Sequence, residues 1–429
     1  MATEDPQERL QQSEAIDAGL PPSDGWQKIF SALRNRNYRW FYLGQTISLI
    51  GTWTRTAALG WVAYQFTRSE FLLGLVFVLN SLPLFVFSIY AGSLADRIPK
   101  MRIFNWSTWF SLLSSMLVAI MLFHGPVHIT VLMAFSALWG VATAFEMPAR
   151  QSLMVELVGE KDLVNAIALN SAMVNATRVI GPAVGGLLLA SVGAAWCFLL
   201  DGLSYLAVLY SIYRMKLPAE HYQVRKVDTG VKYMLEGFRY LKTNVVMAQA
   251  MVLLFIMGLG GWAYQSQLSA FAVTQLHLHE LGYSALLAMN GCGACSAALY
   301  VASQGSRLVR LSTMYTGAMI YGVFIILCGF VHHPAVALSL IFVAGFGIIL
   351  FFSIGNSIIQ TQSPDYLRGR LMGIWALVFG GGMPLGSFWM GVIANRTGSG
   401  RALQVGGAFC LVGAAVVYVV SHSRKQSTE

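Results

Sequence analysis

The 429-residue chain is 56% hydrophobic and only 11% charged, and its formal net charge is +9. Soluble domains have about 45–50% apolar and about 25% charged residues, so the composition excludes a water-soluble globular protein and indicates a lipid bilayer as the solvent. The five cysteines show no paired spacing, which argues against a disulfide-bonded secreted fold.

The first segment, 1–38, is predicted to be a cytoplasmic tail. Its early part leans acidic and contains Pro6, Pro21 and Pro22, a composition typical of chain without fixed structure. Apolar residues from Trp26 to Leu33 then recur at helical spacing beside basic residues, which predicts a helix lying in the membrane interface. The start lacks a basic region followed by a short apolar core, so no cleavable signal peptide is expected.

Twelve apolar segments follow, each near the ~20 residues that a helix needs to cross the hydrocarbon core. They predict an all-α integral membrane protein with twelve transmembrane helices. The expected spans are 39–66, 71–95, 102–123, 127–147, 164–191, 195–214, 244–272, 281–303, 311–331, 334–360, 371–395 and 402–421.

The charges between the spans predict the orientation. Lys and Arg gather almost entirely on one side of the predicted membrane, and the opposite side holds only Arg68, Arg396 and Arg401. Cytoplasmic loops carry such an excess of positive charge, so both termini are expected in the cytoplasm of a plasma-membrane protein. The net charge then reflects membrane topology, and no nucleic-acid partner is expected.

The basic stretch 215–243 is the longest polar insertion between spans and predicts a cytoplasmic linker. It separates two pseudo-symmetric six-helix halves, 39–214 and 244–421, and a short cytoplasmic tail, 422–429, follows the second half. Segments 175–193 and 380–398 support a repeat, because each places a proline among glycines. Transporters built from repeated halves bind their substrates near the membrane midplane, where the halves meet.

A short motif, GSLADRIPKMR at 92–102, joins the second and third spans. It resembles the loop signature of the major facilitator superfamily. The run 145–186 and the stretches 51–67 and 367–375 resemble one branch of that superfamily, which includes enterobactin-exporter-like and macrolide-efflux-like proteins. Two residues depart from the pattern of this branch, since Asp201 stands where a neutral amide is expected and Arg55 where many relatives carry glutamine.

The resemblance implies roles for two motifs. In the superfamily the loop acid holds the cytoplasmic side closed; here that acid is Asp96, and its expected partners are Arg150 and the N-terminal end of the eleventh span near Arg368. The alternative is that these charges only anchor the loop at the interface. The GPAVGG run resembles a fifth-helix signature of antiporters that seals the cavity against ion leak, and the alternative is ordinary packing of small residues. The gating motif comprises Gly92, Asp96, Arg97, Lys100, Arg102 and Arg150, and the antiporter-like motif comprises Arg178, Gly181, Pro182, Gly185 and Gly186.

Charges inside the spans are few, and each costs ~2.5–3.5 kcal/mol on an insertion scale. Arg55, Arg178 and Asp201 lie within spans, and Glu146 lies near the end of the fourth. An acid that pairs with an arginine in one state and takes a proton in another is a minimal coupling device. Asp201 is the first candidate for this role and Glu146 the second, with Arg55 or Arg178 as partner. The alternative is a fixed structural ion pair.

The resemblance also implies that the first, fourth, seventh and tenth spans line a central cavity. Aromatic and amide side chains in these spans suit a bulky amphipathic solute, although each one alone is more often explained by helix packing or by an aromatic at the lipid interface. The candidate cavity residues are Gln45, Thr52, Trp139, Trp262, Tyr264, Gln265, Asn356 and Gln360.

Other kinds of site are not favoured by the sequence. Cys292 and Cys295 lie in mid-span among small residues, which is typical of close helix packing, and the histidines cluster in loops, so neither metal nor cofactor is expected. No GxxxxGK[ST] motif for ATP hydrolysis is present.

The expected function is a monomeric secondary active transporter, not an enzyme, that exports siderophore- or drug-like molecules by alternating access. Its expected partners are the small-molecule substrate, membrane lipid and protons, the latter as counter-ion in antiport. The alternatives on the same fold are a lysophospholipid flippase and an uptake carrier. A channel and an intramembrane enzyme are alternatives of a different class.

Overall fold

The computed structural model describes residues 31–95, 98–215 and 231–426, and within these ranges every regular element is a helix. This confirms the predicted all-α fold. The elements up to residue 214 are η1 (Ser31–Arg34), α3 (Arg36–Thr67), α4 (Glu70–Ala95), α5 (Lys100–His124), α6 (Ile129–Ser191) and α7 (Ala194–Arg214). The later elements are α8 (Val231–Thr243), α9 (Val245–Ile256), η3 (Met257–Trp262), η4 (Ala263–Gln267), α10 (Leu268–Thr274), α11 (Glu280–Gln304), η5 (Gly305–Leu308), α12 (Leu311–Cys328), α13 (Pro334–Gln362), α14 (Asp365–Thr397) and α15 (Ser399–Gln426).

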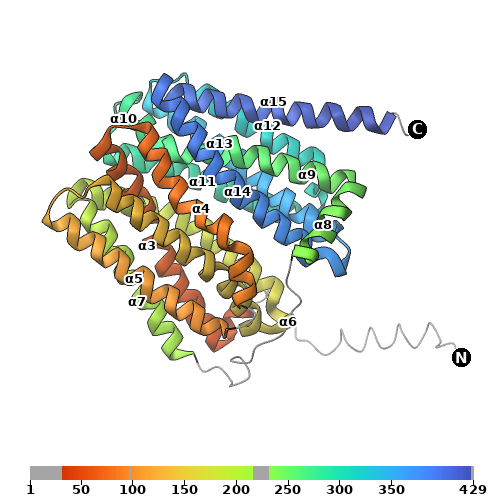
Figure 1. The fold of residues 1–429 in the computed structure, drawn as a ribbon, viewed down its shortest axis with the longest axis horizontal. Helices are drawn as coiled ribbons and strands as arrows, with labels where there is room; N and C mark the ends of the chain where they lie inside the picture. The colour runs from red at the N-terminus through yellow and green to blue at the C-terminus, as the bar shows by residue number, and fades with distance from the viewer. Residues whose placement is uncertain (1–30, 96–97, 216–230, 427–429) are drawn as a thin grey trace, which may run out of the picture.

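Eleven helical segments of the described chain are long and apolar enough to cross a membrane. Helix α3 is not among them although it has 32 residues, because polar and charged side chains such as Gln45, Thr52 and Arg55 lower its hydropathy. It is nevertheless packed between α6 and α7, inside the bundle (Figure 1). The count of twelve spans therefore stays a prediction, with α3 as the twelfth candidate.

The helices form two sets that meet along two seams (Figure 1). Helices α3 to α7 pack mainly on one another, and helices α9 to α15 do the same. Between the sets, α4 lies along α14 and α6 lies along α11. This arrangement agrees with two helical halves, while the exact boundaries predicted for them remain untested.

Two regions differ from the expected simple spans. Helix α6 continues beyond the fourth span to a break at Gly159, where φ is 70°, because apolar side chains such as Leu153 and Leu157 pack against Tyr38 and Phe104. The seventh span is irregular, since residues 257–262 form a π-helical turn and residues 263–267 a 3₁₀ turn.

The predicted linker contains a helix, α8, whose Glu236 pairs with Arg370 of α14.

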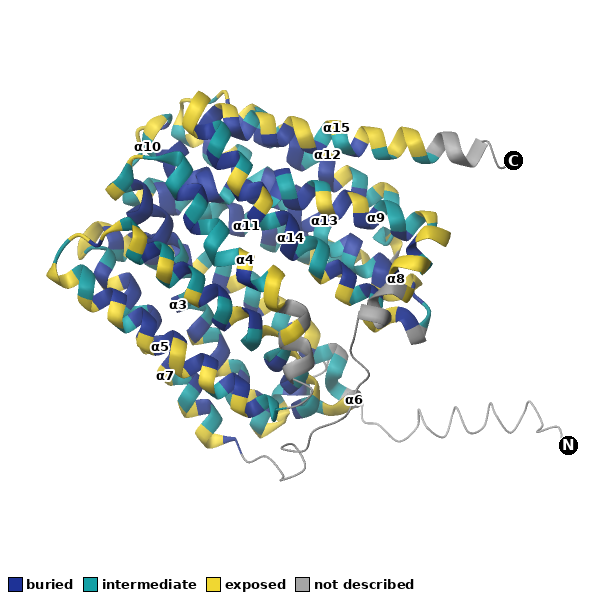
Figure 2. Cartoon of the chain, in the orientation of Figure 1, coloured by how far each residue is buried: buried dark blue, intermediate teal, exposed yellow. Residues whose placement is uncertain are grey.

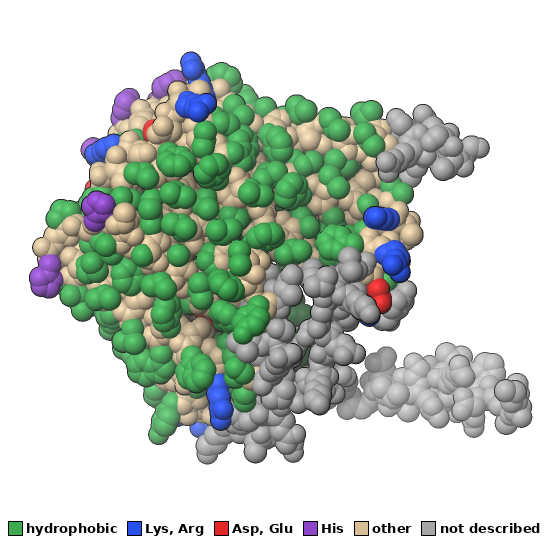
Figure 3. Space-filling model, viewed as in Figure 1, with side chains coloured by type: hydrophobic (Ala, Val, Ile, Leu, Met, Phe, Trp, Pro, Cys, Tyr) green, Lys and Arg blue, Asp and Glu red, His purple; other side chains and the backbone are tan. Residues whose placement is uncertain are grey.

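The surface is that of a protein surrounded by lipid. Large apolar side chains such as Trp106, Leu113 and Val412 are more than 60% exposed, and Figure 2 shows buried residues along the packed helix faces and exposed ones on the outside. In Figure 3 hydrophobic side chains cover the face in view, while Lys, Arg and His lie towards its two ends. Of the predicted interfacial helix, only the end near Leu33 lies within the described residues.

Close helix contact at glycine gives a test of the packing. A Cβ atom added to Gly293 of α11 would overlap the backbone carbonyl of Phe342 in α13, whereas one added to Gly373 of α14 would meet nothing within 4 Å. We expect Gly293→Ala to destabilise the purified protein by about 1–3 kcal/mol and Gly373→Ala to be neutral or slightly stabilising. Thermal unfolding in detergent measures both, and equal midpoints for the two variants would contradict the close contact between α11 and α13.

A candidate transport site among buried charges

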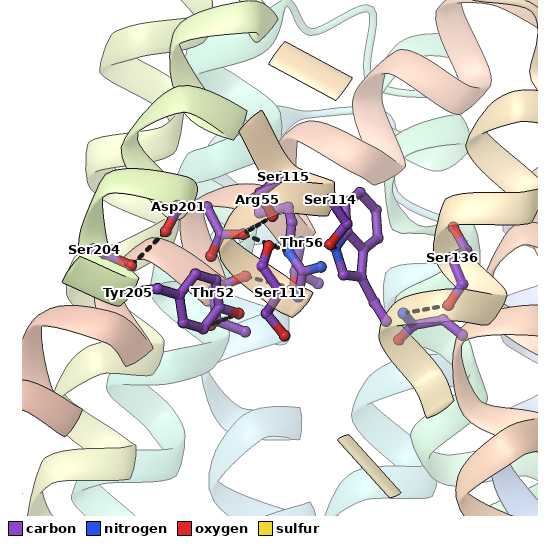
Figure 4. A network of polar contacts seen from close by, with 12 residues as sticks. Thr52, Arg55, Thr56, Ser111, Ser114, Ser115, Ser136, Asp201, Ser204 and Tyr205 are labelled. Atoms are coloured by element: carbon purple, nitrogen blue, oxygen red, sulfur yellow. Dashed lines mark hydrogen bonds and ion pairs between the residues drawn. The ribbon is translucent and has the colours of Figure 1, made fainter. Parts of the chain in front are cut away.

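The described core contains a buried ion pair between α3 and α7. The Nε atom of Arg55 lies 3.0 Å from Oδ2 of Asp201, and the side chains are 8% and 0% exposed (Figure 4). The hydroxyl of Ser115, from α5, donates a hydrogen bond of 2.6 Å to the same carboxylate oxygen. Three helices of the first set therefore converge on one carboxylate. Of the two partners that the sequence left open for Asp201, the structure shows Arg55.

Small residues allow the backbones to approach at this level. A Cβ atom on Gly51 of α3 would collide with Ser204 and lie 3.0 Å from the Cα atom of Asp201. The Ser204 hydroxyl donates within α7 to the backbone carbonyl of Asp201 at 2.7 Å, so it does not compete for the carboxylate. The close contact at Gly51 brings Arg55, one helical turn further along α3, within reach of Asp201.

An aromatic ring covers the other side of the arginine. The guanidinium carbon of Arg55 lies 4.1 Å from the ring centre of Trp139, and the indole N–H of Trp139 donates to the Ser114 hydroxyl at 2.9 Å. A desolvated cation–π contact of this kind contributes about 2 kcal/mol. It offsets part of the cost of holding a charge inside a membrane.

Three polar atoms of the ion pair make no hydrogen bond, namely Oδ1 of Asp201 and Nε and Nη1 of Arg55, of which Nε makes the ion-pair contact. Asp201 can therefore accept a proton on Oδ1 without first breaking a hydrogen bond. Beside the pair is a cavity of about 120 Å³, into which Arg55, Thr52 and Tyr205 all face. Asp201 itself does not line this cavity, whereas its partner Arg55 does.

The same cavity holds the second candidate acid. Glu146 lies 3.8 Å from NH1 of Arg150, one turn along α6, and Arg150 also donates to the Oε1 atom of Gln45 at 3.1 Å. Glu146, Arg150, Gln45, Thr52 and Trp139 all line the cavity. The first-half candidates for coupling and for substrate contact thus meet in one place.

The loop motif is only partly described. Gly92, Asp96 and Arg97 lie outside the residues whose surroundings the structure describes. Of the other members, Lys100 pairs with Glu156 of α6 and Arg102 is exposed. The predicted contact between Asp96 and Arg150 remains a prediction.

The antiporter-like motif lies where α6 meets two other helices. Added Cβ atoms would collide with Trp53 of α3 at Gly181 and with Ser284 of α11 at Gly186. The Thr54 hydroxyl donates to the Gly181 carbonyl at 2.9 Å. The motif glycines therefore allow α6 to contact both sets of helices, and the sealing role implied for them stays a proposal.

Arg178 of this motif occupies the junction between the two sets. Its guanidinium carbon lies 5.2 Å from the ring centre of Trp53 in α3 and 5.3 Å from that of Trp262 in η3. The π-helical turn shifts the side-chain register of this span, a feature frequent at functional sites. Arg178 and Pro182 line a second cavity, together with Gln265.

The remaining candidates for substrate contact lie either in the packed core or near a helix end. Tyr264 is fully buried against Tyr321 and lines neither cavity. Asn356 and Gln360 hydrogen-bond to each other near the end of α13, where Gln360 is exposed. These two residues do not meet the other candidates in the present conformation.

Several participating residues were missed by reasoning from the sequence. Ser114 and Ser115 support the ion pair and its tryptophan, and Trp53 contacts Arg178. The serines at 111, 114 and 115 within an apolar span were an available signal of a polar helix face. Trp53 gave no such signal, because interfacial and core tryptophans are common in membrane helices.

The two sets of apolar helices form the major facilitator fold, which solved membrane transporters share. A bacterial homolog of the human lysosomal transporter Spinster, solved in an inward-facing, unoccupied conformation, matches 90% of this chain and 97% of its own with a TM-score of 0.71 and 14% identity. A nucleoside transporter, NupG, matches 89% of this chain and 99% of its own with a TM-score of 0.70 and 12% identity. Residues 27–429 match the transmembrane secretion effector family, and the chain belongs to this family.

Curated relatives extend along nearly the whole chain. A staphyloferrin A transporter of Staphylococcus aureus is 23% identical over 91% of this chain and 98% of its own. A multidrug efflux pump, Tap, of Mycolicibacterium fortuitum is 26% identical over 80% and 85%. The enterobactin exporter EntS of Shigella flexneri is 25% identical over 87% and 91%. The chain is thus a transporter and not an enzyme, and it is a multi-pass protein of the inner membrane.

The ion pair makes a prediction about stability. Arg55→Gln leaves the Asp201 carboxylate buried without its charge partner, and removing one member of a buried pair costs about 3–5 kcal/mol. We expect the double variant Arg55→Gln/Asp201→Asn to recover more than half of that loss, because neither charge then remains. Thermal unfolding of the purified variants in detergent completes the double-mutant cycle. Additive effects of the two substitutions would show that the residues do not interact.

Proposed function

We propose that this transporter exports small amphipathic molecules, siderophore-like or drug-like, by alternating access coupled to proton antiport. The observation that carries the proposal is the buried Arg55–Asp201 pair beside a cavity that also holds Glu146. A charge pair inside the membrane marks a coupling or transport pathway more often than a scaffold element. The names of the relatives, two of which are called an exporter and an efflux pump, support the direction and the substrate class.

The coupling step follows from the contacts of Asp201. In the present state the carboxylate is held by Arg55 and Ser115. A proton on the free Oδ1 atom neutralises the carboxylate, so the attraction to Arg55 is lost. Arg55 already faces the cavity, where Glu146 offers it an alternative partner. Protonation thus disfavours the arrangement of α3 and α7 in which Arg55 pairs with Asp201 and favours the one in which Arg55 turns to Glu146. A ligand, here a proton, shifts a conformational equilibrium only by such a difference in affinity between two states.

The contacts between the helix sets support a rocking motion. Near one end of the bundle, Trp61 of α3 stacks on Tyr283 of α11 with ring centres 5.7 Å apart, and Gln267 donates to the Glu70 carbonyl at 3.3 Å. These contacts hold the sets together at the end where α4 begins. The loop motif lies at the opposite end of α4, where it would form a latch in the other state.

The proposed orientation predicts the side on which each loop lies. Reporter fusions after Arg102, Lys226 and Arg370 should report the cytoplasm, and fusions after His128 and His332 should report the outside. The physical reason is the excess of Lys and Arg on the first side. One inversion among the first three fusions would overturn the twelve-span topology with cytoplasmic termini.

The coupling role predicts the phenotype of Asp201→Asn. Asparagine keeps the size of the side chain but cannot exchange a proton, so efflux from proteoliposomes should lose its dependence on an imposed pH gradient. Substrate counterflow without a gradient should remain within about twofold of wild type, because exchange needs no net proton transfer. The measurement compares initial rates of efflux with and without the gradient, normalised to reconstituted protein.

Three variants control for this result. Glu280→Gln removes an acid at the far end of the bundle and should leave the pH dependence unchanged. The double variant Arg55→Gln/Asp201→Asn has no unpaired buried charge but still lacks the acid. If it also loses the pH dependence, the loss comes from the missing acid and not from reduced stability. If Asp201→Asn still concentrates substrate with normal pH dependence, the proposed role of Asp201 is wrong. Loss of the pH dependence in Glu146→Gln would then assign the coupling to Glu146.

A further inference from the structure

Two arginines inside the described helical bundle, the buried Arg55 and the half-buried Arg178, are compensated in different ways. Arg55 has a carboxylate partner, whereas no hydrogen bond or ion pair joins the Arg178 side chain to any residue in the described ranges. The Nε atom of Arg178 is buried and lacks a hydrogen-bond partner. The rings of Trp53 and Trp262 face its charge, and Tyr264 lies close enough to interact with it electrostatically. Aromatic rings attract a cation but provide no lone pairs for its N–H groups.

A second buried donor, the side-chain amide of Asn290, belongs to a residue that lines the same cavity. Asn290 of α11 is 4% exposed, lines the same cavity as Arg178, and its Nδ2 atom has no hydrogen bond. The cavity measures about 20 Å³, which is room for roughly one water molecule. It therefore accommodates the oxygen of an entering group rather than a whole ring. Arg178 and Asn290 both line this cavity, and buried donors without partners favour a ligand that brings an acceptor, while the cation among them favours an anion.

Aromatic surface adjoins this position. Trp262 contacts Phe352 and Phe379 edge to face, with ring centres 5.3 and 5.4 Å away. Trp53 presents its ring from the other helix set. A ligand whose anionic group reaches Arg178 would thus place its apolar body between aromatic side chains of both sets.

We propose that Arg178 and Asn290 form the anion-recognition subsite of the transport cavity, which selects substrates carrying a carboxylate or phenolate beside aromatic rings. This inference rests on the proposed transport function. The subsite is separate from the coupling pair, because the cavity at Arg178 and the cavity at Arg55 share no lining residue. It also links recognition to motion, since the rings that flank Arg178 come from both helix sets.

Two dyes with one ring system but different charge test the proposal. Fluorescein is anionic at neutral pH, and rhodamine 123 is a cation with the same xanthene framework. Binding of each dye to the full chain in lipid nanodiscs is measured by fluorescence polarisation. We expect wild type to prefer fluorescein, and Arg178→Gln to weaken fluorescein binding by about tenfold or more while leaving rhodamine 123 binding unchanged or tighter.

Two further variants complete the comparison. Arg178→Lys keeps the cation and should retain part of the preference for fluorescein. Arg68→Gln removes an exposed arginine between α3 and α4 and should match wild type. Size-exclusion profiles show whether each variant is folded. If Arg178→Gln is not folded, the comparison is made with Arg178→Lys.

Three results of the dye-binding experiment would refute the proposed subsite. Equal loss of both dyes would mean that Arg178 only holds the helix sets together through its two tryptophans, and the subsite would be refuted. An unchanged preference in Arg178→Gln, or no binding of fluorescein to wild type, would also refute it. Because no pH gradient is present in the assay, its result is independent of whether Asp201 couples transport to protons.

Discussion

The structure depends on one constraint, which is that a charge within the hydrocarbon region needs compensation by the protein itself. Asp201 meets this constraint with Arg55 of α3 and Ser115 of α5. These contacts tie three helices of the first set to one carboxylate. The ring of Trp139 in α6 completes the surroundings of Arg55, so the polar centre also fixes how α6 packs on α3.

Arg55 and Arg178 illustrate two ways of compensating a charge inside the bundle, with different consequences. Arg55 is neutralised by a carboxylate, and such a pair responds to protons because the acid can lose its charge. Arg178 has no carboxylate partner in the described ranges and lies against aromatic rings, whose electrostatic contribution does not change with pH in the same way. A site of the first kind suits ion coupling and a site of the second kind suits recognition of an anion. Under the two proposals made above, the Arg55–Asp201 pair would serve the driving force and Arg178 would serve selectivity.

Close backbone contacts bring these charged groups to their positions. Gly51 allows α3 to approach α7 beside the ion pair, and Gly181 allows α6 to approach Trp53 beside Arg178. The π-helical and 3₁₀ turns at 257–267 interrupt the seventh span and bring Trp262 to the junction. Irregular backbone is tolerated at this depth because it is enclosed by neighbouring helices rather than by lipid.

The sequence by itself determined the class of fold, the approximate helix bounds and the rarity of intramembrane charge. Apolar length and the positions of Arg55, Arg178 and Asp201 are properties of the linear chain, so they are visible without a structure. Partners are not visible in the same way. Whether Asp201 meets Arg55 or Arg178 depends on which faces of α3, α6 and α7 are turned together, and close packing at single glycines sets that rotation. Only the tertiary structure decided that Arg55 has a carboxylate and that Arg178 has Trp53 and Trp262 instead, since these contacts join residues that are far apart along the chain.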